Sequence, residues 1–309
     1  MTLGRILFLL LGGLLLRGAS AQALVDIPTV TITHPGNSAD PATGFGAVGY
    51  EYRIGKFEVS IVDYTTFLNA VAVSDPYALY NPLMASDLHI AGIVRAGESG
   101  SFVYSVIGTG ERPISQVSWL DAARFCNWLH NGAVANADTE NGAYALNGAT
   151  DGIIPKNADA KWWIPTEDEW YKSAFFQLAT EGGDADNYWL YATRSNALPG
   201  NQIGDQPNQA NYCASTLSVT GESELAPAQN YLTKAGAFTN SASFFGTFDQ
   251  TGNVWEWIDV VLEPRMRSLR GGGWNNPENY QSATFRHTPF WVGHELPEVG
   301  FRVATAATP

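Results

Sequence analysis

The chain has few cysteines, few histidines and little basic charge. Its 309 residues include 2 Cys and 5 His, and 17 Lys and Arg stand against 30 Asp and Glu. Two cysteines permit one disulfide and exclude a disulfide-rich scaffold. A formal net charge of −13 disfavours nucleic acid and anionic lipid as partners and favours cations and cationic ligands. We therefore predict a protein with no nucleic-acid partner.

Long hydrophobic runs are also lacking beyond the first residues. Arg5 precedes an apolar run, residues 6–16, and the small residues 19–23 offer two signal-peptidase sites. We predict that residues 1–23 are a signal peptide and that the chain is exported, to a periplasm or out of the cell. An uncleaved anchor is the alternative, although the run is shorter than the ~20 residues of a membrane span. No second such run follows, so we expect no membrane span in the mature chain.

Aromatic and apolar residues are plentiful. Hydrophobic residues make up 45% of the chain, which includes 10 Trp, so a packed core is expected. No linker or charge run divides the sequence, and we predict one domain over residues 49–309 after a lead-in over residues 24–48. Residues 131–161 and 180–240 lack sustained periodicity and are expected to be long loops that aromatic packing and ions hold in order.

Three short helices carry start signals in the sequence. Ser60 follows an alternating, strand-like run over residues 54–59 and can cap the first helix. Ser118 and Asp121 have the spacing of a capping box before the second helix, and Thr166 and Glu169 repeat it before the third. We therefore predict helices that begin after each of these three caps.

The two cysteines are expected to have structural roles. Cys126 shares one face of the second helix with Trp119, Ala122 and Leu129, which predicts a buried thiol. A disulfide with Cys213 is the alternative.

Six motifs follow one another along the chain, at residues 54–59, 112–119, 163–170, 252–257, 271–276 and 300–303. In this order they resemble the formylglycine-generating, sulfatase-modifying-factor superfamily. This likeness spans about residues 45–305 and implies an α+β, C-type-lectin-like fold with a small, twisted, mostly antiparallel sheet, two to three helices and much irregular loop. Residues 77–104 are insertion-like and do not map onto the oxidases of the superfamily.

The chain departs from the superfamily at the catalytic positions. Copper oxidases of the superfamily hold Cu(I) with two cysteines and convert a substrate cysteine to formylglycine. Alignment on the glycines places Asn276 and Gln281 there, and Gly273 replaces a serine. Carboxamides are poor ligands for Cu(I), which prefers sulfur. We therefore expect no copper-dependent cysteine oxidation and a possible pseudoenzyme.

The resemblance also implies structural calcium. Hard oxygen ligands, six to eight in number, suit Ca²⁺. The alternative for the first site is a turn at Asp249 and a buried ion pair between Glu256 and Arg270 or Arg302. The implied ligands are Asp249, the carbonyls of Gly252 and Val254, and Glu256 at one site, with Asn211 and Tyr212 at a second.

A non-haem iron centre is a further alternative, because relatives that form carbon–sulfur bonds use iron held by three histidines. Those histidines come from a helical domain that this chain lacks. The local candidates are His287, His294 and Glu295, which have the residue types of a facial triad without its spacing.

A binding surface is the remaining functional prediction. Aromatic faces with amide and guanidinium donors suit peptides or sugars, although the same residues can be core and turn formers. We predict a calcium-stabilised binding protein for a peptide, an exported protein or a glycan. An iron or other oxidoreductase acting on an exported protein or small thiol, and a structural envelope or matrix protein, are the alternatives. The predicted ligand-binding residues are Trp274, Asn275, Asn276, Asn279, Tyr280, Arg286, His287 and Trp291.

Overall fold

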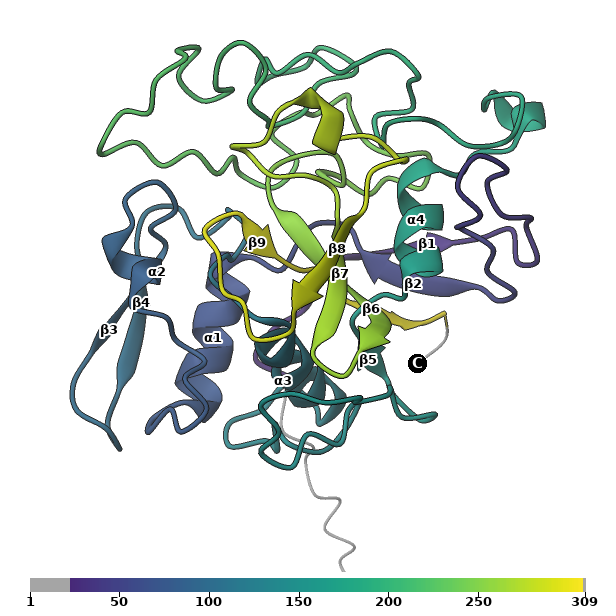
Figure 1. Ribbon diagram of the computed structural model, residues 1–309. Helices are drawn as coiled ribbons and strands as arrows, with labels where there is room; N and C mark the ends of the chain where they lie inside the picture. The colour runs from purple at the N-terminus through teal and green to yellow at the C-terminus, as the bar shows by residue number, and fades with distance from the viewer. Residues whose placement is uncertain (1–22, 308–309) are drawn as a thin grey trace, which may run out of the picture.

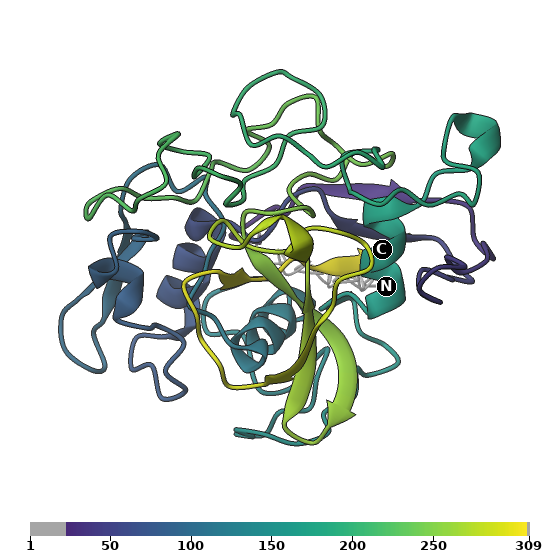
Figure 2. The ribbon, with the colours of Figure 1, turned by 45° about the horizontal axis from the view of Figure 1, so that its top comes forward.

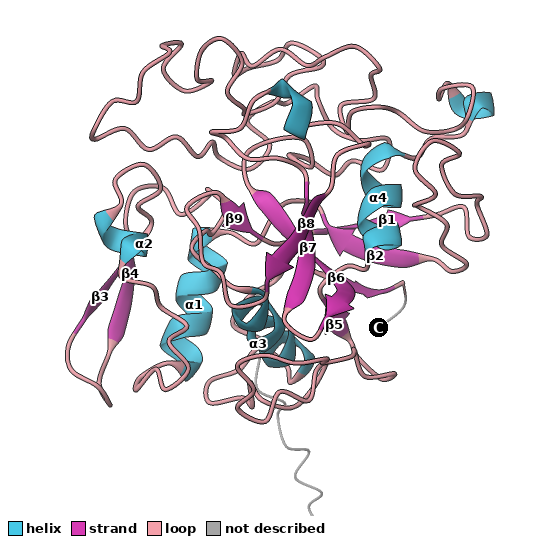
Figure 3. Cartoon of the chain, in the orientation of Figure 1, coloured by secondary structure: helices cyan, strands magenta, loops and turns pink. Residues whose placement is uncertain are grey.

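Two four-stranded sheets and a few short helices form the frame of the protein, as Figure 1 and Figure 3 show. The computed structural model describes residues 23–307. The predicted signal peptide lies outside the described residues except for its last residue. Within the described range, no helix is long and apolar enough to cross a membrane.

The first sheet joins the two ends of the described chain. Its strands run in the order β1 (Thr29–Ile32), β2 (Tyr52–Gly55), β10 (Ala304–Ala306) and β5 (Trp162–Trp163), and all neighbours are antiparallel. The lead-in therefore contributes an edge strand to this sheet. Strand β2 ends at Gly55, earlier than the alternating run predicted, because the following backbone bonds to other segments. Lys56 donates its N–H to Pro28 and Val59 to Phe301, so residues 56–59 join no sheet.

The second sheet carries the glycine-rich motif at one end. Its order is β8 (His287–Trp291), β7 (Met266–Arg270), β6 (Trp255–Glu263) and β9 (Val299–Gly300). Strands β6 and β9 are parallel, and the other pairs are antiparallel. The fold is thus α+β with mostly antiparallel sheets, as predicted.

Three of the helices begin where the sequence predicted. Helices α1 (Ile61–Val71), α3 (Trp119–His130) and α4 (Glu167–Phe175) follow Ser60, Ser118 and Thr166. Each cap side chain accepts a hydrogen bond from the backbone three residues on, and α3 and α4 have complete capping boxes. These caps satisfy donors that a helix end leaves unpaired.

The insertion-like region forms a small unit of its own. It contains α2 (Leu83–Ser86) and the antiparallel pair β3 (Ile93–Ala96) and β4 (Val103–Val106). This hairpin lies beside α1 in Figure 1, and Asn69 of α1 bonds to the backbone of Tyr104 in β4.

An irregular layer covers one side of the frame. Residues 176–254 contain only the short 3-10 turn η1 (Ala179–Glu181) and isolated bridges, and they form the loops at the top of Figures 1 and 3. Figure 2 shows the same loops along one side of the sheets. In these loops, asparagine side chains form hydrogen bonds with backbone groups that neighbouring strands would pair in a sheet. Asn208, for example, donates to the carbonyls of Ala197 and Leu198. The predicted long loops are confirmed in this part of the chain.

Candidate functional site

The glycine-rich turn leaves strand β7 directly after Arg270. Gly271 and Gly272 have φ values of 105° and 77°, in the region that favours glycine. A Cβ on Gly272 would lie 2.4 Å from Oε1 of Gln281. The Gln281 amide therefore occupies the space above Gly272, and only glycine fits there without moving it.

Asn276 and Gln281 are tied into this turn. Oδ1 of Asn276 accepts the N–H of Gly273 at 3.0 Å. Gln281 follows the 3-10 turn η2 (Glu278–Tyr280), is 1% exposed and donates from Nε2 to the Pro277 carbonyl at 3.4 Å. Its Oε1 is buried without a hydrogen-bond partner. The uncharged side chains of Asn276 and Gln281 therefore pack against the glycine-rich turn and bond to nearby backbone groups.

The two thiols lie in different parts of the core, and both are free. Cys126 is fully buried on α3, and burial raises the pKa of its thiol well above the ordinary value. Cys213 is half-buried, packs against the cluster that contains Trp274, and donates its N–H to the Asn276 carbonyl at 3.0 Å. One thiol therefore lies beside the glycine-rich turn, whereas a two-thiolate copper site needs a pair.

Trp274 differs from its predicted role. It is 3% exposed, and its ring stacks on Tyr231 with centroids 5.2 Å apart and planes 10° apart. Leu232, Val254 and Leu217 complete this cluster. Packing against the irregular layer buries the indole face, so Trp274 is a core residue and offers no flat surface to a ligand.

The other predicted ligand-binding residues divide into two groups. Tyr280 and His287 are half-buried around the buried Trp255, with ring centroids 6.1 and 5.5 Å from it. Arg286 donates from Nη2 to Glu167 at 2.7 Å and is therefore paired. Asn275 and Asn279 are exposed beside the glycine-rich turn, and Trp291 is exposed at the other end of β7, where it pairs with Met266.

The carboxylate that the resemblance assigned to calcium pairs with an arginine. Glu256 is fully buried and accepts two bonds from Arg302, at 2.5 and 2.6 Å, and one from the Trp170 indole at 2.8 Å. Burial opposes the charge on Arg302, but the carboxyl groups of Glu256, Glu58 and Asp249 together outweigh it, and the pKa of Arg302 is raised. This pairing is the alternative drawn from the sequence.

Asp249 also has a backbone partner, because it accepts the N–H of Gly236 at 2.7 Å. Its φ of 62° makes it a turn former. Burial raises its pKa to about 6. With Glu256 occupied by Arg302, the set of Asp249, Gly252, Val254 and Glu256 fits a calcium ion only if the guanidinium moves.

At the second implied calcium site, the amide nitrogen of Asn211 and the carbonyl of Tyr212 are hydrogen-bonded within the protein. Asn211 is 2% exposed and donates to the Tyr231 carbonyl and to Oδ1 of Asn253. The Tyr212 carbonyl accepts the Ser218 hydroxyl at 3.2 Å. These contacts join separate segments of the irregular layer to one another.

The structure does not assemble an iron site from the candidate residues. His287 and His294 both pack edge-on against Phe290, and Glu295 accepts a bond from Asn81. Among residues 23–307, no group of three or more His, Cys, Asp or Glu is placed to hold a metal ion.

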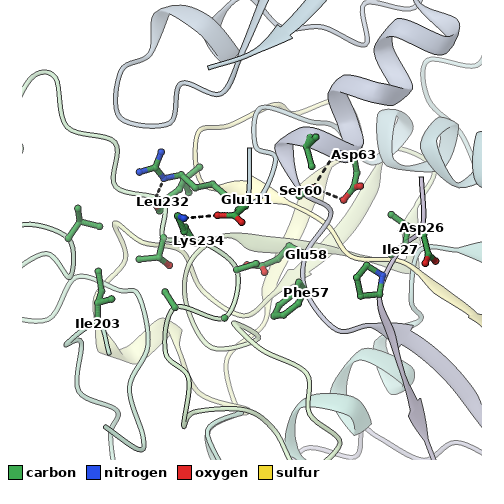
Figure 4. Close-up of a pocket in the computed structure, with 18 residues that line it drawn as sticks. Asp26, Ile27, Phe57, Glu58, Ser60, Asp63, Glu111, Ile203, Leu232 and Lys234 are labelled. Atoms are coloured by element: carbon green, nitrogen blue, oxygen red, sulfur yellow. Dashed lines mark hydrogen bonds and ion pairs between the residues drawn. The ribbon is translucent and has the colours of Figure 1, made fainter. Parts of the chain in front are cut away.

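A cavity of about 780 Å³ lies next to the cluster that contains Trp274 (Figure 4). The segment before β1, the start of α1 and the irregular layer surround it. It shares Leu232 and Val219 with the Trp274 cluster. The lining residues are Asp26, Ile27, Pro28, Phe57, Glu58, Ser60, Val62, Asp63, Glu111, Arg112, Ile203, Val219, Leu232, Thr233, Lys234, Ala235, Gly236 and Ala237.

Comparison with known protein families settles the ancestry of the chain. The family model described as "Sulfatase-modifying factor enzyme 1-like domain" matches residues 9–307. The chain belongs to this family. The resemblance inferred from the six motifs is confirmed.

A mouse protein (Mus musculus), "Inactive C-alpha-formylglycine-generating enzyme 2", is 23% identical to this sulfatase-modifying-factor chain over 204 residues. The match covers 64% of the chain and 50% of the relative, so the chain spans about half the length of that protein.

One solved structure, CarF, agrees with the family at the level of the fold. CarF has a TM-score of 0.53 at 18% identity, and the match covers 92% of this chain and 99% of CarF. PvdO from Pseudomonas aeruginosa has a TM-score of 0.48 at 16% identity, covering 91% and 92% of the two chains. The likeness to CarF supports the predicted α+β, sulfatase-modifying-factor fold.

One residue of this sulfatase-modifying-factor domain was missed by the sequence analysis. Glu58 lies in the wall of the cavity and is 4% exposed, whereas the sequence placed it only in an alternating run and in the first family motif. Its position between Phe57 and Val59, an acid within an apolar pattern, was the available signal.

Proposed function

We propose that this chain is a sulfatase-modifying-factor protein that does not catalyse copper-dependent cysteine oxidation and acts by binding a peptide or glycan. The main support for this proposal is that two carboxamides, Asn276 and Gln281, occupy the positions where the superfamily oxidases have cysteines. Their contacts with Gly273 and Pro277 give each amide a structural role. The inactive mouse relative supports the same proposal.

The test is a conversion assay on the purified, copper-loaded protein. A cysteine peptide of the sulfatase type is incubated with O₂ and analysed by mass spectrometry for the aldehyde product, beside a competent formylglycine-generating oxidase as control. We expect no product from this chain. Product formation that persists in Cys213→Ser would contradict the proposal outright. Product that disappears in Cys213→Ser would contradict it as well, and would assign the activity to that thiol.

The proposed binding surface runs from the exposed residues Asn275 and Asn279, which follow the glycine-rich turn, to the exposed Trp291, which pairs with Met266 at the other end of β7. Aromatic and amide groups of this kind recognise sugars and peptide backbones. Screening against glycan and peptide arrays tests this part. We expect Trp291→Ala to weaken any specific signal at least tenfold, with Leu225→Ala, another exposed apolar residue, as the matched control.

Export and calcium belong to the same proposal. Cleavage of the leader is checked by the N-terminal mass of protein from the cell envelope or medium, expected to begin at residue 22 or 24. Calcium is checked by elemental analysis of protein purified without chelators. Because Arg302 already neutralises Glu256, an ion bound there would have to displace a buried guanidinium.

A further inference from the structure

The cavity in Figure 4 contains a buried carboxyl group with an oxygen that lacks a partner. Glu58 is 4% exposed and accepts one bond, from Nδ2 of Asn253 to Oε1 at 3.1 Å. Its Oε2 is buried and has no hydrogen-bond partner. A buried carboxyl oxygen without a partner is costly, and the cost is relieved by a donor or a cation.

More negative charge lies directly behind Glu58. Asp249 contacts Gly236, which itself lines the cavity, and Glu256 lies in the same buried group with Arg302. Asp249, Arg302 and Glu256 are the charged groups that act on the Glu58 carboxyl. The carboxyl groups of Glu58, Asp249 and Glu256 thus have a single counter-charge, the guanidinium of Arg302. Negative charge is therefore in excess among these four residues.

The two basic residues of the cavity lining, Lys234 and Arg112, are bonded to groups other than Glu58. Lys234 pairs with Glu111 at 2.6 Å, and both side chains are more than half exposed. Arg112 donates from Nε to the Leu232 carbonyl at 2.8 Å. Asp26 and Asp63 add two further acids to the lining. Figure 4 shows Glu58 between the Lys234–Glu111 pair on one side and Ser60 and Asp63 on the other.

The rest of the cavity wall is apolar, and the cavity has the size of a small-molecule site. Ile27, Phe57, Val62, Ile203 and Leu232 contribute aliphatic and aromatic surface. A cavity of about 780 Å³ lies within the range of roughly 300–1,000 Å³ that small-molecule sites occupy. A hydrated inorganic ion would leave most of this apolar surface uncovered.

We propose that this cavity binds an organic cation, a primary ammonium or guanidinium group on an apolar stem, with Glu58 as the acceptor of its charge. The stem lies against Phe57 and Ile203, and the cationic head pairs with the carboxyl group of Glu58, whose side chain turns to bring the buried Oε2 to the cavity. A small amine or a lysine or arginine side chain of a peptide has this chemistry. The inference is independent of the proposal on copper, because it uses neither Asn276 nor Gln281.

Isothermal titration with three probes of equal stem length tests the proposal: hexylammonium, 1-hexanol and hexanoate. We expect hexylammonium to bind at least tenfold more tightly than the other two. In Glu58→Gln, which keeps the acceptor for Asn253, the affinity for hexylammonium should fall at least tenfold. Glu224→Gln is the matched control and should change the affinity less than threefold, because Glu224 is an exposed acid outside the cavity lining.

A second variant keeps the test decisive if Glu58→Gln does not fold. Ile203→Trp fills the cavity from an exposed loop position, 48% exposed, and should abolish hexylammonium binding without lowering the melting temperature. Equal binding of hexanol and hexylammonium, or undiminished binding in folded Glu58→Gln, would overturn the proposal. Stoichiometric binding of calcium that displaces hexylammonium and depends on Glu58 would also overturn it, in favour of a metal site.

Discussion

At the scale of single residues, the glycine-rich turn depends on what surrounds Gly272. The φ of 77° alone would cost a non-glycine residue about 1–2 kcal/mol. The nearby Gln281 amide adds steric conflict, since a Cβ would approach it to 2.4 Å.

We therefore predict that Gly272→Ala lowers the free energy of unfolding more than Gly36→Ala does. Gly36 has a φ of 79°, and no atom lies within 4 Å of the point that a Cβ would occupy there, so it isolates the backbone cost. The difference should be about 1–3 kcal/mol, the usual cost of overpacking, measured by urea denaturation. The double variant Gly272→Ala/Gln281→Ala should recover part of it. Equal losses at Gly36 and Gly272 would show that the amide does not fill this space.

The Glu256–Arg302 pair supports a second prediction at this scale. Removal of one partner leaves the other charge buried, so Glu256→Gln or Arg302→Met should each cost about 3–5 kcal/mol. The double variant should cost less than the two single variants added together, measured by a double-mutant cycle. A chelator should leave the melting temperature of the wild type unchanged if Arg302 is the counter-ion. A large chelator effect would instead favour calcium at Glu256.

The misreading of Trp274 also belongs to this scale. Its motif was recognised, but its exposure depends on Tyr231 and Leu232, which come from the irregular layer more than 40 residues earlier. No pattern in the sequence near Trp274 predicts its contacts with Tyr231 and Leu232. The charge state and environment of Glu58 were equally out of reach, because Asp249 and Glu256 approach it only in the folded chain.

At the scale of elements, local signals were sufficient. Ser60, Ser118 and Thr166 cap the helices that they predicted, since a cap and its bonded N–H are three residues apart. Strand pairing was predicted only through the family likeness. The central strand β10 meets β2 across about 250 residues, and such distant pairing leaves no local trace.

The cap of α3 gives a prediction for this scale. Ser118→Ala removes the hydroxyl that accepts the Asp121 N–H and should lower the free energy of unfolding by about 1 kcal/mol. Thr66→Ala, within α1, is the control, because its hydroxyl only returns to the Val62 carbonyl of its own helix. We expect little or no loss there by chemical denaturation. Similar losses in both variants would argue against a capping role for Ser118.

At the scale of the whole molecule, buried acids give stability a definite pH dependence. Burial raises the pKa values of Asp121, Asp249 and Asp259 to about 6 in the folded protein. Their ordinary value is 3.8, so the folded state holds protons that the unfolded state releases. The stabilisation from these groups is therefore present at low pH and lost as the pH rises through about 6. His287 opposes this trend, because burial lowers its pKa.

We predict that the free energy of unfolding falls between pH 5 and pH 8. Asp249→Asn should make that fall smaller by about 1 kcal/mol, since one group no longer titrates. Denaturant titrations at both pH values provide the measurement, with Asp138→Asn, at the loop surface, as the control variant. An identical pH profile for wild type and Asp249→Asn would contradict the raised pKa.

The location of β10 has a consequence for biosynthesis. This strand completes an interior position between β2 and β5, and Arg302 just before it links Gly55, Phe248 and Glu256. A ribosome must therefore release nearly 300 residues before the nascent polypeptide can close its first sheet. Until then the interior position between β2 and β5 stays vacant, so the first sheet cannot form during most of the synthesis of the chain.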